Sequence, residues 1–281
     1  TSATAFAEPT VSGSTEFKYL DRTSLQASLA GSSMVTDSEI KFSFTNKTDN
    51  GLTINYTVEM LSDGADTTID ESSFSVAGGF GKFVFGQNDD VTDNYAMSAQ
   101  DLIAEEESAT VASSSISTNT DIADASDNTK VAYHIPAMMG ITAGVSYEDS
   151  GAGTSNANIS AAGARYATEV NGMAITLAGA YSNTEASTEN TVDTNLGFLI
   201  VNGKISASVA TSSKNSLDED VTANGVSLSY ALNDDITLGA YSMGSSDSDD
   251  SGEEYKKAGV EVQYKIASGL TAVINLDDYE Y

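Results

Sequence analysis

The sequence predicts an all-β fold, a transmembrane antiparallel β-barrel, from two observations. First, short segments alternate between apolar and polar residues: residues 52–60 read LTINYTVEM, in which every second side chain from Leu52 to Met60 is apolar. Side chains of a strand point alternately to opposite faces, so such a segment has one apolar and one polar wall. Second, the joints between segments switch between very short and long, which is typical of transmembrane barrels with one short-turn end and one long-loop end.

The alternation recurs along the whole chain and gives the strands in order. We expect them at residues 9–20, 36–48, 52–62, 72–79, 82–88, 129–135, 141–149, 157–168, 173–183, 191–201, 203–213, 222–232, 235–245, 255–266 and 270–279. Short joints contain glycine, as in Asp49-Asn50-Gly51 and Asn202-Gly203. In residues 52–57 we expect the apolar side chains to face lipid and the polar ones to face the lumen. A register slip of one residue would invert this for the whole strand.

These ranges make about fifteen strands, whereas single-chain bacterial barrels have even strand numbers. The last residues, Asp277 to Tyr281, read as the start of another long loop. We therefore expect a sixteenth strand beyond this sequence and a barrel of the 16-stranded type, whose lumen is an open aqueous channel. The uninterrupted rhythm predicts one domain over residues 1–281.

The composition limits the cellular compartments in which this protein could function. No stretch approaches 18 consecutive apolar residues, which excludes a membrane helix. The absence of cysteine fits a cell-envelope protein without disulfides, and also many cytosolic proteins. Residues 1–7 read TSATAFA and resemble the end of a secretory signal peptide, with a disordered tail as the alternative. Together with the barrel pattern, this favours export.

The net charge of −29 is extreme. It excludes nucleic-acid binding, which needs clustered Lys and Arg against phosphates. Much of the acid lies in the long joints, where it has two interpretations. It is a solvated surface that keeps the protein soluble, or it is a negative potential at the mouth of a pore that concentrates cations.

One joint, residues 89–129, is far longer than the others. Loops beyond about fifteen residues are uncommon and usually functional or disordered. Residues 98–107 could form a short helix with Ser98 as its cap. Residues 113–127 contain few apolar side chains and would stay solvated.

Two short motifs carry a family resemblance. Residues 8–13 (EPTVSG) and 78–89 (GGFGKFVFGQND) resemble the first and fifth strands of Gram-negative general porins, especially those of alphaproteobacteria. The layout agrees over the whole chain, although the final strand with its terminal Phe is lacking and Arg is scarce. The resemblance implies a trimeric, non-enzymatic channel in the outer membrane of a Gram-negative bacterium. It would contact membrane lipid and lipopolysaccharide and pass small hydrophilic solutes and ions.

In that family the third loop folds into the lumen, and acidic residues on the loop face basic residues of the opposite wall. The resemblance therefore implies that residues 89–129 form the constriction. Its acidic candidates are Asp89, Asp90, Asp93, Asp101, Glu105, Glu106 and Glu107. The basic candidates, at inward-facing positions, are Lys18, Lys41, Lys82, Arg165 and Lys204. With the net charge, this arrangement predicts a channel that prefers cations.

Other chemistry is sparse. With one histidine, His134, and no cysteine, His-based catalytic triads and zinc sites are almost excluded. No cofactor is expected, apart from weak Ca²⁺ binding at Asp247, Asp249 and Asp250, which lack the loop pattern of an EF-hand. This leaves two rivals to the channel: an acidic, calcium-binding structural or adhesive surface protein, and a barrel enzyme that would have to use His134.

Overall fold

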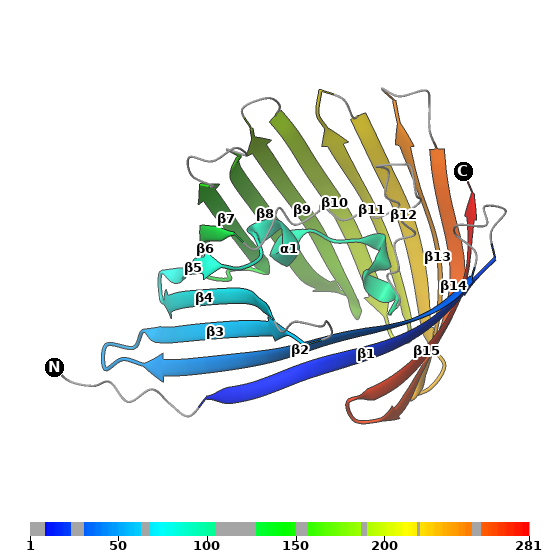
Figure 1. Ribbon diagram of the computed structural model, residues 1–281, viewed down its shortest axis with the longest axis horizontal. Coiled ribbons are helices and arrows are strands. Elements are labelled where there is room, and N and C mark those ends of the chain that lie inside the picture. Colours follow the sequence, from blue (N-terminus) through cyan, green and yellow to red (C-terminus); the bar gives the residue numbers. More distant parts are fainter. Residues whose placement is uncertain are drawn as a thin grey trace.

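The computed structural model describes residues 9–23, 31–62, 68–104, 128–149, 157–186, 190–217, 220–248 and 254–280. These form a single antiparallel sheet of 15 strands in which each strand pairs with its neighbours in sequence (Figure 1). The strands are β1 (Thr10–Arg22), β2 (Gly31–Lys47), β3 (Thr53–Leu61), β4 (Thr68–Gly78), β5 (Gly81–Gln87), β6 (Thr129–His134), β7 (Ile141–Asp149), β8 (Asn158–Val170), β9 (Met173–Glu185), β10 (Asn190–Asn202), β11 (Ile205–Asn215), β12 (Asp220–Ala231), β13 (Ile236–Asp247), β14 (Glu254–Ala267) and β15 (Leu270–Glu280).

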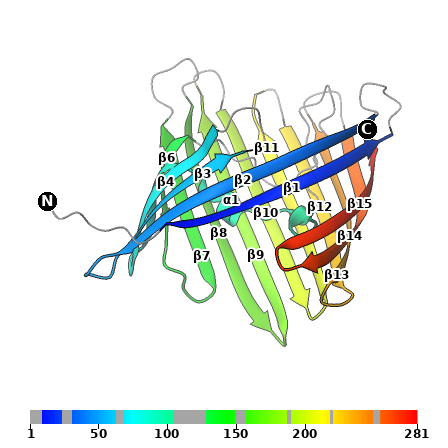
Figure 2. The same cartoon turned by 60° about the horizontal axis from the view of Figure 1, so that its bottom comes forward.

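The sheet curves into a wall around two short helices, α1 (Val91–Tyr95) and the 3₁₀ turn η1 (Ala99–Leu102) (Figures 1 and 2). Among the described residues, pairing runs from β1 to β15 without a ladder between these two strands. The predicted antiparallel β-barrel is confirmed, with its wall open between the first and last strands. Neither helix is long and apolar enough to cross a membrane.

The register confirms the predicted orientation of the third strand. Tyr56 pairs with Phe74 on the outward face and is 40% exposed. Thr57 pairs with Ser73 on the inward face and is buried. Exposed apolar side chains recur on the outward faces of the other strands, as with Val226 on β12. An apolar outer face suits lipid, and a polar inner face suits water.

Two strands begin earlier than predicted. β2 starts at Gly31 and β4 at Thr68, where the expected starts were residues 36 and 72. Neither start shows a regular alternation, because β2 opens with Gly31-Ser32-Ser33 before the adjacent apolar pair Met34-Val35 and β4 opens with Thr68-Ile69-Asp70-Glu71, so periodicity could not detect them. The β1–β2 ladder nevertheless continues to the pair Arg22 and Gly31, because backbone hydrogen bonding does not require apolar side chains.

The two-faced wall predicts that charge is tolerated on one face only. Leu228→Arg, on the outward face of β12, should destabilise the barrel by about 2–4 kcal/mol if it lies near the bilayer midplane. Ser206→Arg is the control, because Ser206 pairs with Ser229 on the inward face at nearly the same height. Urea unfolding in lipid vesicles measures both. An equal loss of stability would contradict the assigned faces.

Candidate functional site

The segment 88–104 leaves β5 and runs along the inner face of the wall. α1 packs against β7, β8 and β9, and η1 packs against β11, β12 and β13 (Figure 1). The described part of the long joint is therefore folded into the lumen. We call this segment the inner loop.

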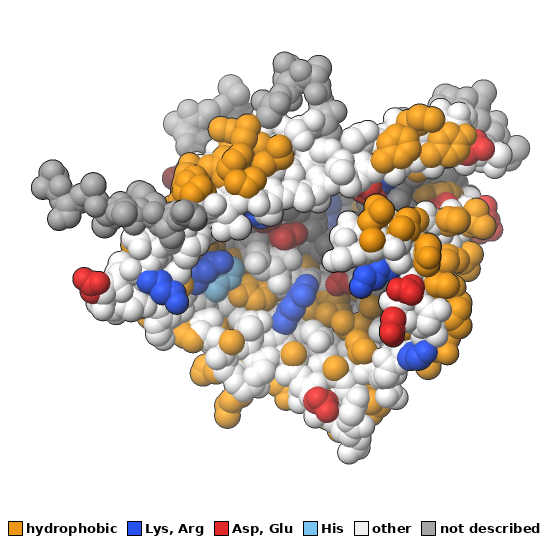
Figure 3. Space-filling model, turned by 90° about the horizontal axis from the view of Figure 1, so that it is seen from below, with side chains coloured by type: hydrophobic (Ala, Val, Ile, Leu, Met, Phe, Trp, Pro, Cys, Tyr) orange, Lys and Arg blue, Asp and Glu red, His pale blue; other side chains and the backbone are white. Residues whose placement is uncertain are grey.

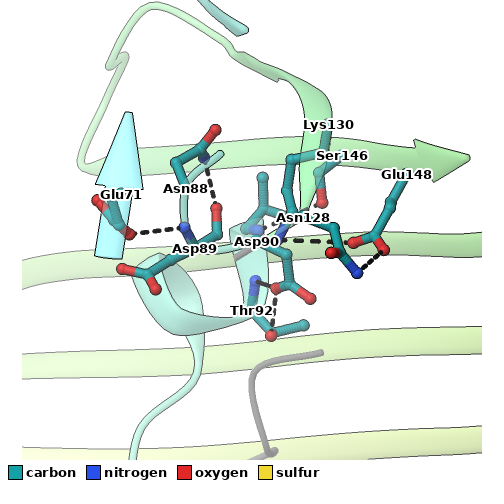
Figure 4. Close-up of polar contacts among 10 residues, drawn as sticks. Glu71, Asn88, Asp89, Asp90, Thr92, Asn128, Lys130, Ser146 and Glu148 are labelled. Carbon is teal, nitrogen blue, oxygen red and sulfur yellow. Dashed lines mark hydrogen bonds and ion pairs between the residues drawn. The ribbon is translucent and has the colours of Figure 1, made fainter. Parts of the chain in front are cut away.

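The inner loop begins at the N-cap of α1, which is Asp90 (Figure 4). The Asp90 side chain accepts hydrogen bonds from the backbone N–H of Thr92, at 2.6 Å, and from its hydroxyl. Just before the cap, the N–H of Asp89 donates to Glu71 Oε1 of β4 at 2.9 Å. Just after the cap, the N–H of Val91 donates to Ser146 Oγ of β7 at 3.3 Å. These bonds fix where the chain turns into the lumen.

A buried ion pair lies beside this cap. Lys130 Nζ of β6 is 3.8 Å from Glu148 Oε2 of β7, and both side chains are almost fully buried. Asn128 donates to Glu148 Oε1 at 2.7 Å (Figure 4). The pair ties the end of the long joint to the wall next to its beginning.

Inward-facing glycines make room for the side chains of the inner loop. A Cβ at Gly163 of β8 would lie 2.5 Å from Tyr95 Cβ, and one at Gly197 of β10 would lie 2.5 Å from Met97 Cβ. These distances are far below a carbon–carbon contact. The loop can lie flat on the wall only because the wall has no side chain at these positions.

Polar side chains of the wall hold the backbone of the inner loop. Asn195 of β10 accepts from the N–H of Met97 and donates to its carbonyl, both at 3.0 Å. Arg165 of β8 donates from Nε to the Tyr95 carbonyl at 3.2 Å and from Nη2 to the carbonyl of Ala96. Ser208 of β11 donates to the Ser98 carbonyl at 3.3 Å.

The far end of the described loop is also capped and anchored. Ser98 caps η1: its Oγ accepts from the N–H of Gln100 at 3.0 Å, and its own N–H donates to Asp101 Oδ1 at 3.1 Å. The N–H of Ala104 donates to Glu261 Oε1 of β14 at 2.9 Å. The predicted cap residue is therefore present. The helix expected over residues 98–107 is a single 3₁₀ turn within the described residues, and α1 was not predicted.

The predicted acidic residues differ in their surroundings. Asp90 is buried and caps α1, whereas Asp93 and Asp101 are exposed on α1 and η1. Although Asp101 is exposed to the lumen, the surrounding wall desolvates its carboxyl group and raises its pKa, against the lowering effects of the Ser98 N–H and Arg165. Asp89 lies at the start of the inner loop. Glu105, Glu106 and Glu107 lie outside the described residues.

The predicted basic residues also differ in their contacts and positions. Lys18 pairs with Glu16 at 3.3 Å, and Lys41 pairs with Glu59. Lys204 lies in the turn between β10 and β11, where it donates to the Leu232 carbonyl at 2.8 Å. This differs from the expected position on an inward-facing strand segment.

The two remaining basic residues lie on the wall that carries the loop. Lys82 faces the lumen in register with His134, and Arg165 holds the loop backbone from beneath. Of the predicted calcium site, Asp247 is buried at the end of β13 and accepts from the N–H of Asp220 at 3.4 Å. Asp249 and Asp250 lie outside the described residues.

Sequence reasoning missed the anchors Asn195, Ser208 and Glu261. The sequence could have indicated the two glycines that contact the loop. Gly163 and Gly197 each lie inside a predicted strand, and an isolated glycine in a strand often marks a close approach of another backbone. No comparable signal marks Asn195, because any polar residue suits an inward position.

Filling the glycine contact should displace the inner loop. Gly163→Val places two methyl groups where Tyr95 packs, so we expect a loss of about 1–3 kcal/mol from overpacking and a higher single-channel conductance. Gly179→Val is the control, since the nearest contact of a Cβ there is the flexible end of Leu196 at 3.3 Å. Planar-bilayer recordings compare the two variants. Unchanged conductance in Gly163→Val would show that the loop does not narrow the channel.

Comparison with solved structures gives several porins of the same fold. A mutant of Rh. blastica porin has a TM-score of 0.71 at 17% identity, over 96% of this chain and 94% of that one. A loop-deletion mutant of OmpT, an outer membrane protein of Vibrio cholerae, has a TM-score of 0.67 at 15% identity, over 97% and 94%. An anion-selective porin from Comamonas acidovorans has a TM-score of 0.67 at 15% identity, over 97% and 89%.

These identities are low, so the likenesses establish the fold alone. No curated protein sequence matches the chain. The family match is stronger evidence. The family model described as Gram-negative porin matches residues 1–281, the entire sequence. With the curved antiparallel wall and the inner loop, this match shows that the chain belongs to the Gram-negative porin family, whose members are channels of the outer membrane.

Proposed function

We propose that this outer-membrane porin lets small hydrophilic solutes and ions diffuse passively and that it prefers cations. The observation that carries the preference is how the lysines of the inner wall are arranged. Four of them lie within ion-pair distance of a carboxylate: Lys18 with Glu16, Lys41 with Glu59, Lys130 with Glu148, and Lys257 with Asp277. A cation paired in this way contributes little net positive potential to the water beside it.

Further acidic side chains make the electrostatic potential of the lumen more negative. Glu39 lies on the same inward face as Lys41, and Asp93 and Asp101 are exposed on the inner loop. Two unit charges 4 Å apart interact by roughly 1 kcal/mol in bulk water and several-fold more near protein. Salt screens charges beyond about 10 Å at 0.1 M. Acids on the loop should therefore matter more than distant ones.

The sign of selectivity has to be argued from residues and not from the fold. The porin of Comamonas acidovorans is described as anion-selective and shares the fold of this chain. The same barrel therefore supports either preference, and the side chains of the lumen decide it. Here the net charge is −29.

We expect a reversal potential that favours cations in a salt gradient and that shrinks as ionic strength rises. Asp93→Asn with Asp101→Asn should weaken it, and asparagine at 101 keeps an oxygen that can accept from Ser98. The control is Asp234→Asn with Asp235→Asn, in the exposed turn between β12 and β13. Equal effects from the two pairs would contradict the role of the loop. Anion preference of the unmodified protein would contradict the charge argument.

We also propose that the porin forms a homotrimer through the outward faces of β4 to β6. Phe83 packs on Tyr133 with ring centroids 4.6 Å apart and on Phe85 at 6.2 Å. Phe83 and Phe85 are exposed and Tyr133 is half-buried beside them, so that the three rings form an aromatic patch. Remaining outward faces would contact outer-membrane lipid, including lipopolysaccharide.

Phe83→Lys should therefore dissociate the assembly. Phe83 is 39% exposed, and Phe198 on β10 is a matched control at 38%. Native mass spectrometry in detergent should give three times 29.1 kDa for the unmodified protein and for Phe198→Lys, and a single copy for Phe83→Lys. Trimers of both variants would place the interface elsewhere.

The rival hypotheses have weaker support. Among the described residues, no group of three or more His, Asp or Glu side chains is placed to hold a metal ion. Weak calcium binding at Asp247, Asp249 and Asp250 stays a prediction. A barrel enzyme would have to use His134, whose Nδ1 lies 2.9 Å from the Tyr95 hydroxyl.

A further inference from the structure

Two cations, Lys82 and Arg165, lie on the part of the inner wall that carries the inner loop. In the part of the chain that the structure describes, no carboxylate forms an ion pair with Lys82 or Arg165. The Lys82 residue is exposed to the lumen, and Arg165 is half-buried. In a chain with a net charge of −29, two such cations on one wall are unexpected.

These two residues belong to one basic cluster with His134. Lys82 and His134 are partners in the β5–β6 ladder, so their side chains lie on the same face about 5 Å apart at Cβ. The Tyr95 hydroxyl lies 2.9 Å from His134 Nδ1, and the Tyr95 carbonyl accepts from Arg165 Nε at 3.2 Å. His134 and Arg165 thus contact the hydroxyl and the carbonyl of Tyr95, and Lys82 lies beside His134.

The cluster lies on the turn side of the inner loop. Lys82 is the second residue of β5, directly after the short turn at residues 79–80, and His134 is the last residue of β6. Short turns of such barrels face the periplasm. Seen from below, Lys and Arg side chains and a His side chain border the hollow of the molecule (Figure 3).

We propose that Lys82, His134 and Arg165 bind an oxyanion, the carboxylate or phosphate group of a solute, on the periplasmic side of the constriction. This inference rests on the proposed channel function. Arg165 has five N–H donors, and the two loop carbonyls take one each, which leaves donors for a ligand. The Lys82 ammonium adds three more. When the Tyr95 hydroxyl donates to Nδ1, the second ring nitrogen of His134 carries a proton and is also a donor.

Electrostatics favours binding at this position. Hydrogen bonds between ionised groups are about twice as strong as neutral ones. Arg165 and His134 are half-buried against the wall, so salt screens a charge beside them less than a charge at the rim, whereas Lys82 is exposed. Lys82 has no structural partner among the described residues, whereas Arg165 also holds the loop. Lys82 therefore tests the site without disturbing the constriction.

The experiment is single-channel recording in planar bilayers at neutral pH with inorganic phosphate, and separately succinate, added to one side at a time. Either anion should reduce the current of the unmodified porin, and more strongly from one side than from the other. Lys82→Gln should weaken the block about tenfold, a loss of one charge-assisted hydrogen bond, and Lys82→Arg should retain it. Lys204→Gln, which removes a lysine at the turn rim, should behave as the unmodified protein.

Each other outcome has a defined meaning. An unchanged block in Lys82→Gln, or an equal block from both sides, would overturn the oxyanion site. A block by only one of the two anions would narrow the ligand class to phosphate or to carboxylate and so support the site. Broadening of the phosphorus NMR line by the detergent-solubilised protein, lost in Lys82→Gln, measures binding without conductance. The site can thus be judged even if the reversal potential contradicts cation preference.

Discussion

The antiparallel hydrogen-bond ladder is the constraint on which the rest of this structure depends. A bilayer offers no water to unpaired backbone N–H and C=O groups, so a chain that crosses it in strands must pair each strand with its neighbours. The ladder from β1 to β15 does this for the described strands. Once pairing is fixed, alternation of side chains follows, and the apolar outer face and the polar inner face are consequences of one register. At Val226 and Val209, for example, partners on adjacent strands both face outward.

A wall of this kind has no conventional core, and the inner loop supplies the closest equivalent. Val91 and Ala99 are fully buried, and Val91, Tyr95, Val84, Ala132 and Ala161 form one apolar cluster. The cluster exists because the loop presses apolar residues onto inward positions where the wall carries Gly, Ala or Val. The loop backbone is then held because Asn195 and Glu261 accept hydrogen bonds from its N–H groups and Arg165 donates to its carbonyls, so these polar groups do not need lumen water. Packing and polar anchoring together fix the shape of the channel.

The sequence predicted the strands well because lipid on one side and water on the other impose a period of two. It failed at the first residues of β2 and β4, where the ladder extends beyond the alternating segment. The inward path of the loop came from the family resemblance. What each charged side chain contacts could not be predicted. Arg165 was expected to face the loop across the lumen, yet it lies beneath the loop on the same wall. Only the spatial register of β8 with α1 determines that position.

The arrangement of charge shows why net charge is an incomplete guide to a channel. A lysine paired with a carboxylate, such as Lys41 with Glu59, is nearly neutral to a passing ion, whereas an unpaired lysine acts with its full charge. The inner wall contains both kinds. Lysines with a carboxylate partner lie on β1, β2, β6 and β14, and Lys82 lies with His134 and Arg165 on the turn side of the loop. With the proposed cation preference and the proposed oxyanion site, a cation and an anion would meet opposite local fields at different depths. Bulk selectivity would then report the stronger of two barriers and not the average charge of the protein.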